Sequence, residues 1–206
     1  STISSADLTV GGDYRQTAGK VALGTTLKVG GALAVNDASL NAGEDVSVSG
    51  NFTAGSAAFA TSANLVVGGA YSQASGTTDV GGDVTVGSGI VVDNASFNVG
   101  GTVATGGGYA QSGGMTIAGA DFDVDGNVRM QDGLLTVAGD AGVTGDYIQT
   151  ASILDAGGRM QVGGAYAQTG GAADVGGSLA VQSSLTVNGG KLAANGSIGT
   201  GGDYTQ

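Results

Sequence analysis

The chain has 206 residues with a formal net charge of -11; 43 residues are glycine, and proline, cysteine, histidine and tryptophan are absent. Without cysteine or histidine it lacks disulfides, thiolate metal sites and the usual general base near neutral pH. The acidic balance argues against a nucleic-acid partner, and no run of roughly 18 apolar residues predicts a membrane span. A hydrophobic fraction of 41% argues against a disordered chain.

A six-residue pattern, Gly-Gly-x-Tyr-x-Gln, recurs at separations that are all multiples of 19 residues. It occupies 11–16, 68–73, 106–111, 163–168 and 201–206, and 144–149 has the same pattern with threonine for the first glycine. Cutting the chain every 19 residues gives ten full repeats and an eleventh that stops three residues short, with no insertion or deletion. Self-similarity at a fixed period is typical of solenoids. We therefore predict a single uninterrupted solenoid over residues 1–206.

Apolar residues within each repeat come in pairs that are two residues apart. In the first repeat these pairs predict strands over residues 2–4, 8–10 and 14–16, and each later repeat has the same three. The period of two places both members of a pair on one face of a strand, while Gly, Asp, Asn and Ser between the pairs favour turns. Three short strands and three corners per repeat predict a triangular coil, with successive coils about 4.8 Å apart.

These coils predict an all-β fold, a parallel β-helix of about eleven coils with three parallel sheets. The general rule for parallel crossovers favours a right-handed winding. A left-handed triangular helix is the competitor, but its hexapeptide rule would give about 18 residues per coil instead of 19.

The fourteenth position of each repeat is the predicted aromatic core column. All six tyrosines occupy it, and each is followed two residues later by glutamine. A buried phenol needs a hydrogen-bond partner, which the glutamine amide can supply. The alternative is that this edge of the coil is partly solvated, so that the ends of the tyrosine and glutamine side chains reach water. We favour the paired interpretation. The column consists of Tyr14, Leu33, Phe52, Tyr71, Ile90, Tyr109, Val128, Tyr147, Tyr166, Leu185 and Tyr204.

The segment 121–132 has the acidic, glycine-turned start of a calcium loop. Its apolar residues fall on core positions, however, so the alternate aspartates should point outward along a strand instead of surrounding an ion. We expect no cofactor and no metal. Calcium stays open as an alternative, with Asp121, Asp123, Asp125 and Asp132 as its ligands.

Aspartate also recurs at the seventh position, just before the second strand of the coil, as Asp7, Asp45, Asp83, Asp121 and Asp140. Such a column could bind cations or supply paired carboxylates for hydrolysis. The simpler interpretation is that aspartate favours turns by binding nearby backbone amides. We prefer it because other residue types interrupt the column. With no phosphate loop and no nucleophile elbow either, we do not expect an enzyme.

Glycine-rich repeats of this length with alternating apolar residues, as in Gly163–Gly171 followed by Ala172–Val181, resemble filamentous-haemagglutinin-type repeats. These belong to large bacterial adhesins and exoproteins of the two-partner-secretion and autotransporter kind. The resemblance implies a right-handed parallel β-helix that is secreted and located on the bacterial cell surface or in the extracellular matrix.

The leading functional hypothesis is a non-catalytic extracellular structural protein, the shaft or fibre-forming segment of a surface adhesin or biofilm filament. Because the last repeat keeps the consensus, we expect continuation in a longer chain or head-to-tail self-association, with contacts to cell surfaces or polysaccharide. The alternative is a carbohydrate-binding or carbohydrate-active β-helix. That class builds its cleft from long corner loops, whereas the corners predicted here have three or four residues.

Overall fold

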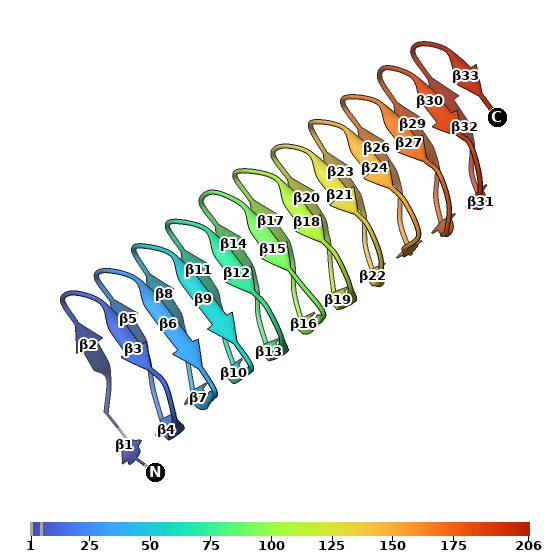
Figure 1. Ribbon diagram of the computed structural model, residues 1–206. Coiled ribbons are helices and arrows are strands. Elements are labelled where there is room, and N and C mark those ends of the chain that lie inside the picture. The colour runs from blue at the N-terminus through green and yellow to red at the C-terminus, as the bar shows by residue number, and fades with distance from the viewer. Residues whose placement is uncertain (1, 5) are drawn as a thin grey trace.

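The computed structural model describes residues 2–4 and 6–206 and shows a rod of stacked coils, with the N-terminus at one end and the C-terminus at the other (Figure 1). Within the described residues the strands form three parallel sheets of eleven strands each. This confirms the predicted all-β solenoid with three strands per coil. The right-handed winding stays a prediction. The described part of the chain contains no helix with the length and hydropathy needed to cross a membrane.

Every third strand belongs to the same sheet, so each sheet runs the length of the rod. Sheet A contains β1 (Thr2–Ser4), β4 (Gly19–Leu23), β7 (Ala38–Ala42), β10 (Ala57–Thr61), β13 (Gly76–Val80), β16 (Ala95–Val99), β19 (Gly114–Ala118), β22 (Leu134–Val137), β25 (Ile153–Ala156), β28 (Ala172–Val175) and β31 (Lys191–Ala194). Sheet B contains β2 (Leu8–Val10), β5 (Leu27–Val29), β8 (Val46–Val48), β11 (Leu65–Val67), β14 (Val84–Val86), β17 (Val103–Thr105), β20 (Phe122–Val124), β23 (Ala141–Val143), β26 (Met160–Val162), β29 (Leu179–Val181) and β32 (Ile198–Thr200). Sheet C contains β3 (Tyr14–Gln16), β6 (Leu33–Asn36), β9 (Phe52–Gly55), β12 (Tyr71–Gln73), β15 (Ile90–Val92), β18 (Tyr109–Gln111), β21 (Val128–Met130), β24 (Tyr147–Gln149), β27 (Tyr166–Gln168), β30 (Leu185–Val187) and β33 (Tyr204–Thr205).

The register of the sheets is constant along the rod. Leu65 pairs with Val84 in sheet B, and Tyr71 pairs with Ile90 in sheet C, so each residue lies beside the residue 19 positions later. A slip of one residue would turn the apolar side chains of a strand outward. Each coil therefore fixes the register of the next one by burying its own inward pairs.

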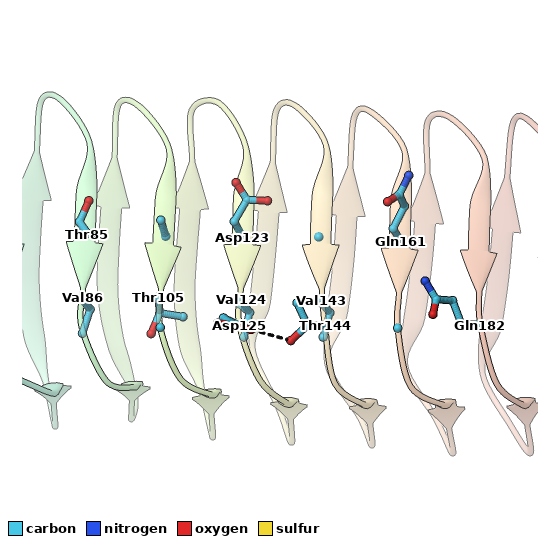
Figure 2. A pocket seen from close by; sticks show the side chains of 14 residues that line it. Thr85, Val86, Thr105, Asp123, Val124, Asp125, Val143, Thr144, Gln161 and Gln182 are labelled. Carbon is cyan, nitrogen blue, oxygen red and sulfur yellow. Dashed lines mark hydrogen bonds between the residues drawn. The ribbon is translucent and has the colours of Figure 1, made fainter.

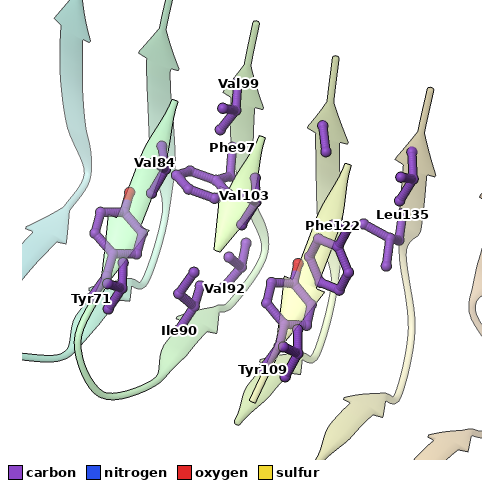
Figure 3. Packing of buried hydrophobic residues seen from close by; sticks show 14 of the residues in the cluster. Tyr71, Val84, Ile90, Val92, Phe97, Val99, Val103, Tyr109, Phe122 and Leu135 are labelled. Carbon is purple, nitrogen blue, oxygen red and sulfur yellow. The ribbon is translucent and has the colours of Figure 1, made fainter. Parts of the chain in front are cut away.

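Large side chains fill the interior, as Figure 3 shows for the coils around Tyr71 and Tyr109. The ring centroids of Phe52 and Tyr71 are 5.2 Å apart in an edge-to-face contact, and those of Tyr147 and Tyr166 are 5.1 Å apart in a stacked one. The core column at the fourteenth position is buried from Leu33 to Leu185. Tyr204, in the last coil, is 54% exposed because no later coil covers it.

Two of the three corners in each coil have the predicted length of three or four residues, and the third is shorter in several coils. From β2 onward, the two corners that flank sheet B have three residues each, and the corner between sheets C and A has one to three. Except between β24 and β25, this last corner turns at a residue with positive φ. In most coils that residue is a glycine, such as Gly76 with φ of 85°, and in three coils it is Asp37, Ser56 or Asn94, one position earlier.

We expect Gly76→Ala to destabilise the rod by roughly 1–3 kcal/mol, because alanine is strained at positive φ and its Cβ would contact the carbonyl oxygen of Ala57. Gly199→Ala is the matched control, since a Cβ there meets no atom within 4 Å. Urea unfolding of both variants measures the difference. Equal midpoints would contradict the role given to the positive φ.

Candidate functional site

The structure places the four aspartates of the candidate calcium loop at separate locations. Phe122 and Val124 of β20 are buried, so Asp123 points outward from sheet B while Asp121 and Asp125 lie in the corners at the two ends of this strand. Asp132 lies in a different corner, between β21 and β22. Among the residues that the structure describes, no group of three or more acidic side chains is arranged to hold a metal ion.

Three of these carboxylates already accept hydrogen bonds within the fold. Asp121 accepts the backbone N–H of Asp140 at 2.8 Å, Asp125 accepts the Thr144 hydroxyl at 3.1 Å (Figure 2), and Asp132 accepts the N–H of Gly133 at 2.7 Å. The pKa of Asp123 is raised by partial burial and by the charges of Asp121 and Asp140. The three hydrogen-bonded carboxylates thus have different partners in different corners.

The acidic column at the seventh position joins consecutive coils. Each carboxylate accepts the backbone N–H of the same position in the next coil, at 2.7–3.3 Å: Asp7 from Thr26, Asp45 from Asn64, Asp83 from Thr102, Asp121 from Asp140 and Asp140 from Arg159. The sequence suggested a bond to a nearby amide in the same turn. The partner instead lies 19 residues away, because stacking places the same position of the next coil directly beside the carboxylate.

A second ladder of this kind occupies the thirteenth position, in the corner between sheets B and C. Asp13, Asn51, Asn127 and Asp146 accept the N–H of the residue 19 positions later, at 2.8–2.9 Å. Sequence reasoning missed this ladder, although the recurrence of Asp and Asn at one position was a usable signal. Both ladders satisfy corner amides that the short strands leave unpaired.

Arg159 and Asp140 form an ion pair at the corner between sheets A and B. The Arg159 Nη2 lies 2.9 Å from the Asp140 Oδ2, and both side chains are largely exposed. The backbone N–H and then the side chain of Arg159 lower the pKa of Asp140. An exposed pair of this kind contributes little to stability, so we assign it no role beyond the corner ladder.

The tyrosine and glutamine pairs form buried hydrogen-bond networks, which confirms the paired interpretation. Tyr71, Tyr109, Tyr147 and Tyr166 each donate to the Oε1 of the glutamine two residues later, at 2.7–3.2 Å. Tyr14 does not donate to Gln16 in this way, because the Oε1 of Gln16 is buried without a hydrogen-bond partner.

The amide nitrogens of Gln111, Gln149 and Gln168 each donate to two carbonyl oxygens in different coils. Gln111 Nε2, for example, donates to the carbonyl oxygens of Gly114 and Leu134, both at 3.1 Å. Tyr71 and Tyr109 have a further partner each, in Thr78 Oγ1 at 2.7 Å and Thr116 Oγ1 at 2.6 Å. Both threonines are fully buried.

Burial raises the pKa of Tyr71, Tyr109, Tyr147 and Tyr166 above the usual value of 10.0. The neutral phenols therefore favour the folded state, and their full contribution is present below pH 10. As the pH rises above 10, the unfolded chain ionises first and stability is lost. We expect these four phenols to ionise together with unfolding, in an ultraviolet titration followed beside circular dichroism. Smooth ionisation of all tyrosines in the folded rod would contradict this.

Two shallow hollows lie on the outer faces of the rod. One, of about 650 Å³, runs over sheet B and is lined by Asp123, Asp125, Thr144, Gln161 and Gln182 among others. Figure 2 shows Asp123 and Gln161 projecting from their strands, and Gly142, which has no side chain, pairs with both of them in the sheet. The other, of about 710 Å³, follows Asn41, Asp79 and Asn98 along sheet A. Carboxylate, amide and hydroxyl groups of this kind can bind the hydroxyls of a sugar.

No model of a protein family, no curated protein and no solved structure matches this chain.

Proposed function

We propose that this chain is a non-catalytic extracellular structural protein, a shaft or fibre-forming segment of a bacterial cell-surface adhesin or biofilm filament. The observation that carries the proposal is the constant cross-section of the rod. All three sheets keep one register, and from β2 onward no corner exceeds three residues. Such corners offer no long loops from which a deep cleft could be built.

The fold suits a mechanical role because its backbone hydrogen bonds run along the rod. Each strand pairs with the strands of the coils before and after it, and the corner ladders add side-chain bonds in the same direction. A solenoid of this kind gains stability from every interface between neighbouring repeats. The edge of a coil can accept another coil of the same shape, either in a longer chain or head-to-tail from a second copy.

Electron microscopy combined with proteolysis tests this proposal. We expect straight rods of uniform width that resist digestion, and head-to-tail fibres would repeat about every 50 Å from the coil spacing. The same preparation should release no products from polysaccharides, with or without calcium. Flexible or branched particles, rapid digestion or robust polysaccharide turnover would each contradict the structural role.

The hollow on sheet B favours a second candidate, a carbohydrate-binding rod. Asp123, Thr144 and Gln161 line it together, and they offer both acceptors and donors to sugar hydroxyls. Screening soluble glycans against the chain and Asp123→Ala tests this candidate. We expect weakened binding in the variant, and equal binding by both proteins, or by neither, would contradict it.

A further inference from the structure

Sheet A carries a run of large apolar side chains on its outer face. Met115, Leu134 and Ile153 are neighbours in three consecutive strands, and Ile117 lies beside Met115 on β19. Ile153 is 51% exposed.

The exposed Val66 and Val91 are isolated by comparison: Val66 lies between Ser47 and Thr85 on sheet B, and Val91 between Ser72 and Ala110 on sheet C. A contiguous apolar patch on an otherwise polar surface marks an interaction site.

We propose that this patch, Met115, Ile117, Leu134 and Ile153, is the centre of a contact between two copies of this chain. The two rods would pack sheet A against sheet A and run in opposite directions. The two-fold axis that relates them would lie between the two sheets, parallel to β22, and pass next to Leu134. This arrangement brings Leu134 against its own copy and Met115 against Ile153 of the second copy, so that these apolar side chains face each other, while Ile117 comes opposite Asp155 at the edge of the patch.

The charges at the two ends of the contact, on β13 and β31, favour this antiparallel arrangement, although Asp155 faces Ile117. The same axis places Asp174 opposite Asn98 and Lys191 opposite Thr77, and Asp79 follows Thr77 two residues later on the same strand. In a parallel arrangement, Asp155 and Asp174 of both copies would gather in the same two coils, and their like charges would repel. The antiparallel contact separates these carboxylates and gives Lys191 an acidic neighbour.

The size of the contact sets its strength. The contact covers the seven strands of sheet A from β13 to β31. With a spacing of about 4.8 Å between strands and a strand length of about 15 Å, these strands present roughly 500 Å² of sheet A per copy. The total of roughly 1,000 Å² lies near the lower limit of specific interfaces. We therefore expect a weak dimer that dissociates on dilution. The pairing involves only the side of the rod, so it does not depend on the proposed shaft role.

Because the chain lacks cysteine, single cysteines can map the contact. Packed sheets lie about 10 Å apart, beyond the reach of a disulfide, so the probe is a short bis-maleimide. We expect Leu134→Cys to give mainly cross-linked dimer, and Val91→Cys on sheet C to stay mainly monomeric. A mixture of Thr77→Cys and Lys191→Cys should cross-link, whereas each of the two alone should do so no more than Val91→Cys.

Analytical ultracentrifugation provides the independent readout. We expect Ile153→Lys to raise the dissociation constant at least about tenfold, and Val66→Lys, on the equally exposed face of sheet B, to change it less than about twofold, with unchanged circular dichroism in both. A wild-type chain that stays monomeric at high concentration, equal cross-linking at positions 134 and 91, or equal effects of the two lysine variants would overturn the contact. Cross-linking at 134 without cross-linking between 77 and 191 would overturn the antiparallel arrangement.

Discussion

Replacing Val67 with aspartate is expected to unfold the middle of the rod, whereas the same replacement at the preceding residue, Val66, is expected to be nearly neutral. Both residues belong to β11, but Val67 is 1% exposed and Val66 is 45% exposed. An unpaired carboxylate in the apolar interior costs at least about 4 kcal/mol. On the outer face of sheet B, the carboxylate stays hydrated, and its cost should lie within about 0.5 kcal/mol.

The position of Val67 decides how the loss should appear. A solenoid is held together by contacts between neighbouring repeats, so a damaged fourth coil separates the coils before it from those after it. We expect urea unfolding of Val67→Asp, followed by circular dichroism, to begin at lower urea and to split into more than one phase. Limited proteolysis should cut first near β11. A single transition at the wild-type midpoint, or equal losses for the two variants, would contradict the assignment of the inner and outer faces.

The same contrast explains how far the fold could be predicted from the sequence. Val66 and Val67 are chemically identical, so hydropathy alone cannot tell which one is buried. The columns of the 19-residue repeat do so, because the position of Val67 is apolar in most repeats and that of Val66 is not. The strand positions, the constant register and the aromatic column all follow from this comparison between repeats.

The corners were predicted less well, because their geometry depends on single backbone dihedral angles. The corner between sheets C and A turns at Gly76 in one coil but at Asn94 in the next, one position earlier. Asn94 is followed by Ala95, which is 4% exposed and fills the corner with its methyl group. At Gly76 a Cβ would instead meet the backbone of Ala57. Two local solutions satisfy the same period, so the period cannot choose between them.

The outer surface was not predictable from the repeat at all. The apolar patch of sheet A spans only three coils, and its residues share no consensus with the equivalent positions of other repeats. Its members become neighbours only because stacking places residues 19 apart side by side. The same is true of the hollow around Gly142, where one missing side chain between Asp123 and Gln161 shapes the surface.

Gln149→Leu tests whether the buried tyrosine and glutamine networks stabilise the rod. Gln149 is fully buried; its Nε2 donates to the carbonyl oxygens of Ser152 at 2.6 Å and Ala172 at 2.9 Å, and its Oε1 accepts the Tyr147 hydroxyl at 3.2 Å. Leucine has a similar size but leaves these three groups without their partner. Since each unsatisfied buried group costs about 1–3 kcal/mol, we expect a loss of roughly 2–4 kcal/mol after partial relaxation.

Two further variants separate the network from side-chain volume. Gln161→Leu makes the same chemical change at an exposed position of sheet B and should alter the free energy of unfolding by less than about 0.5 kcal/mol. Tyr147→Phe removes only the hydroxyl, so adding it to Gln149→Leu should cost less than it does alone, since no phenol is then left unpaired. This non-additivity, about 1 kcal/mol in a double-mutant cycle of urea unfolding, is the signature of the pair. Strict additivity, or equal losses for the two glutamine variants, would mean that Gln149 contributes only its volume, and that the recurring tyrosine and glutamine do not act together.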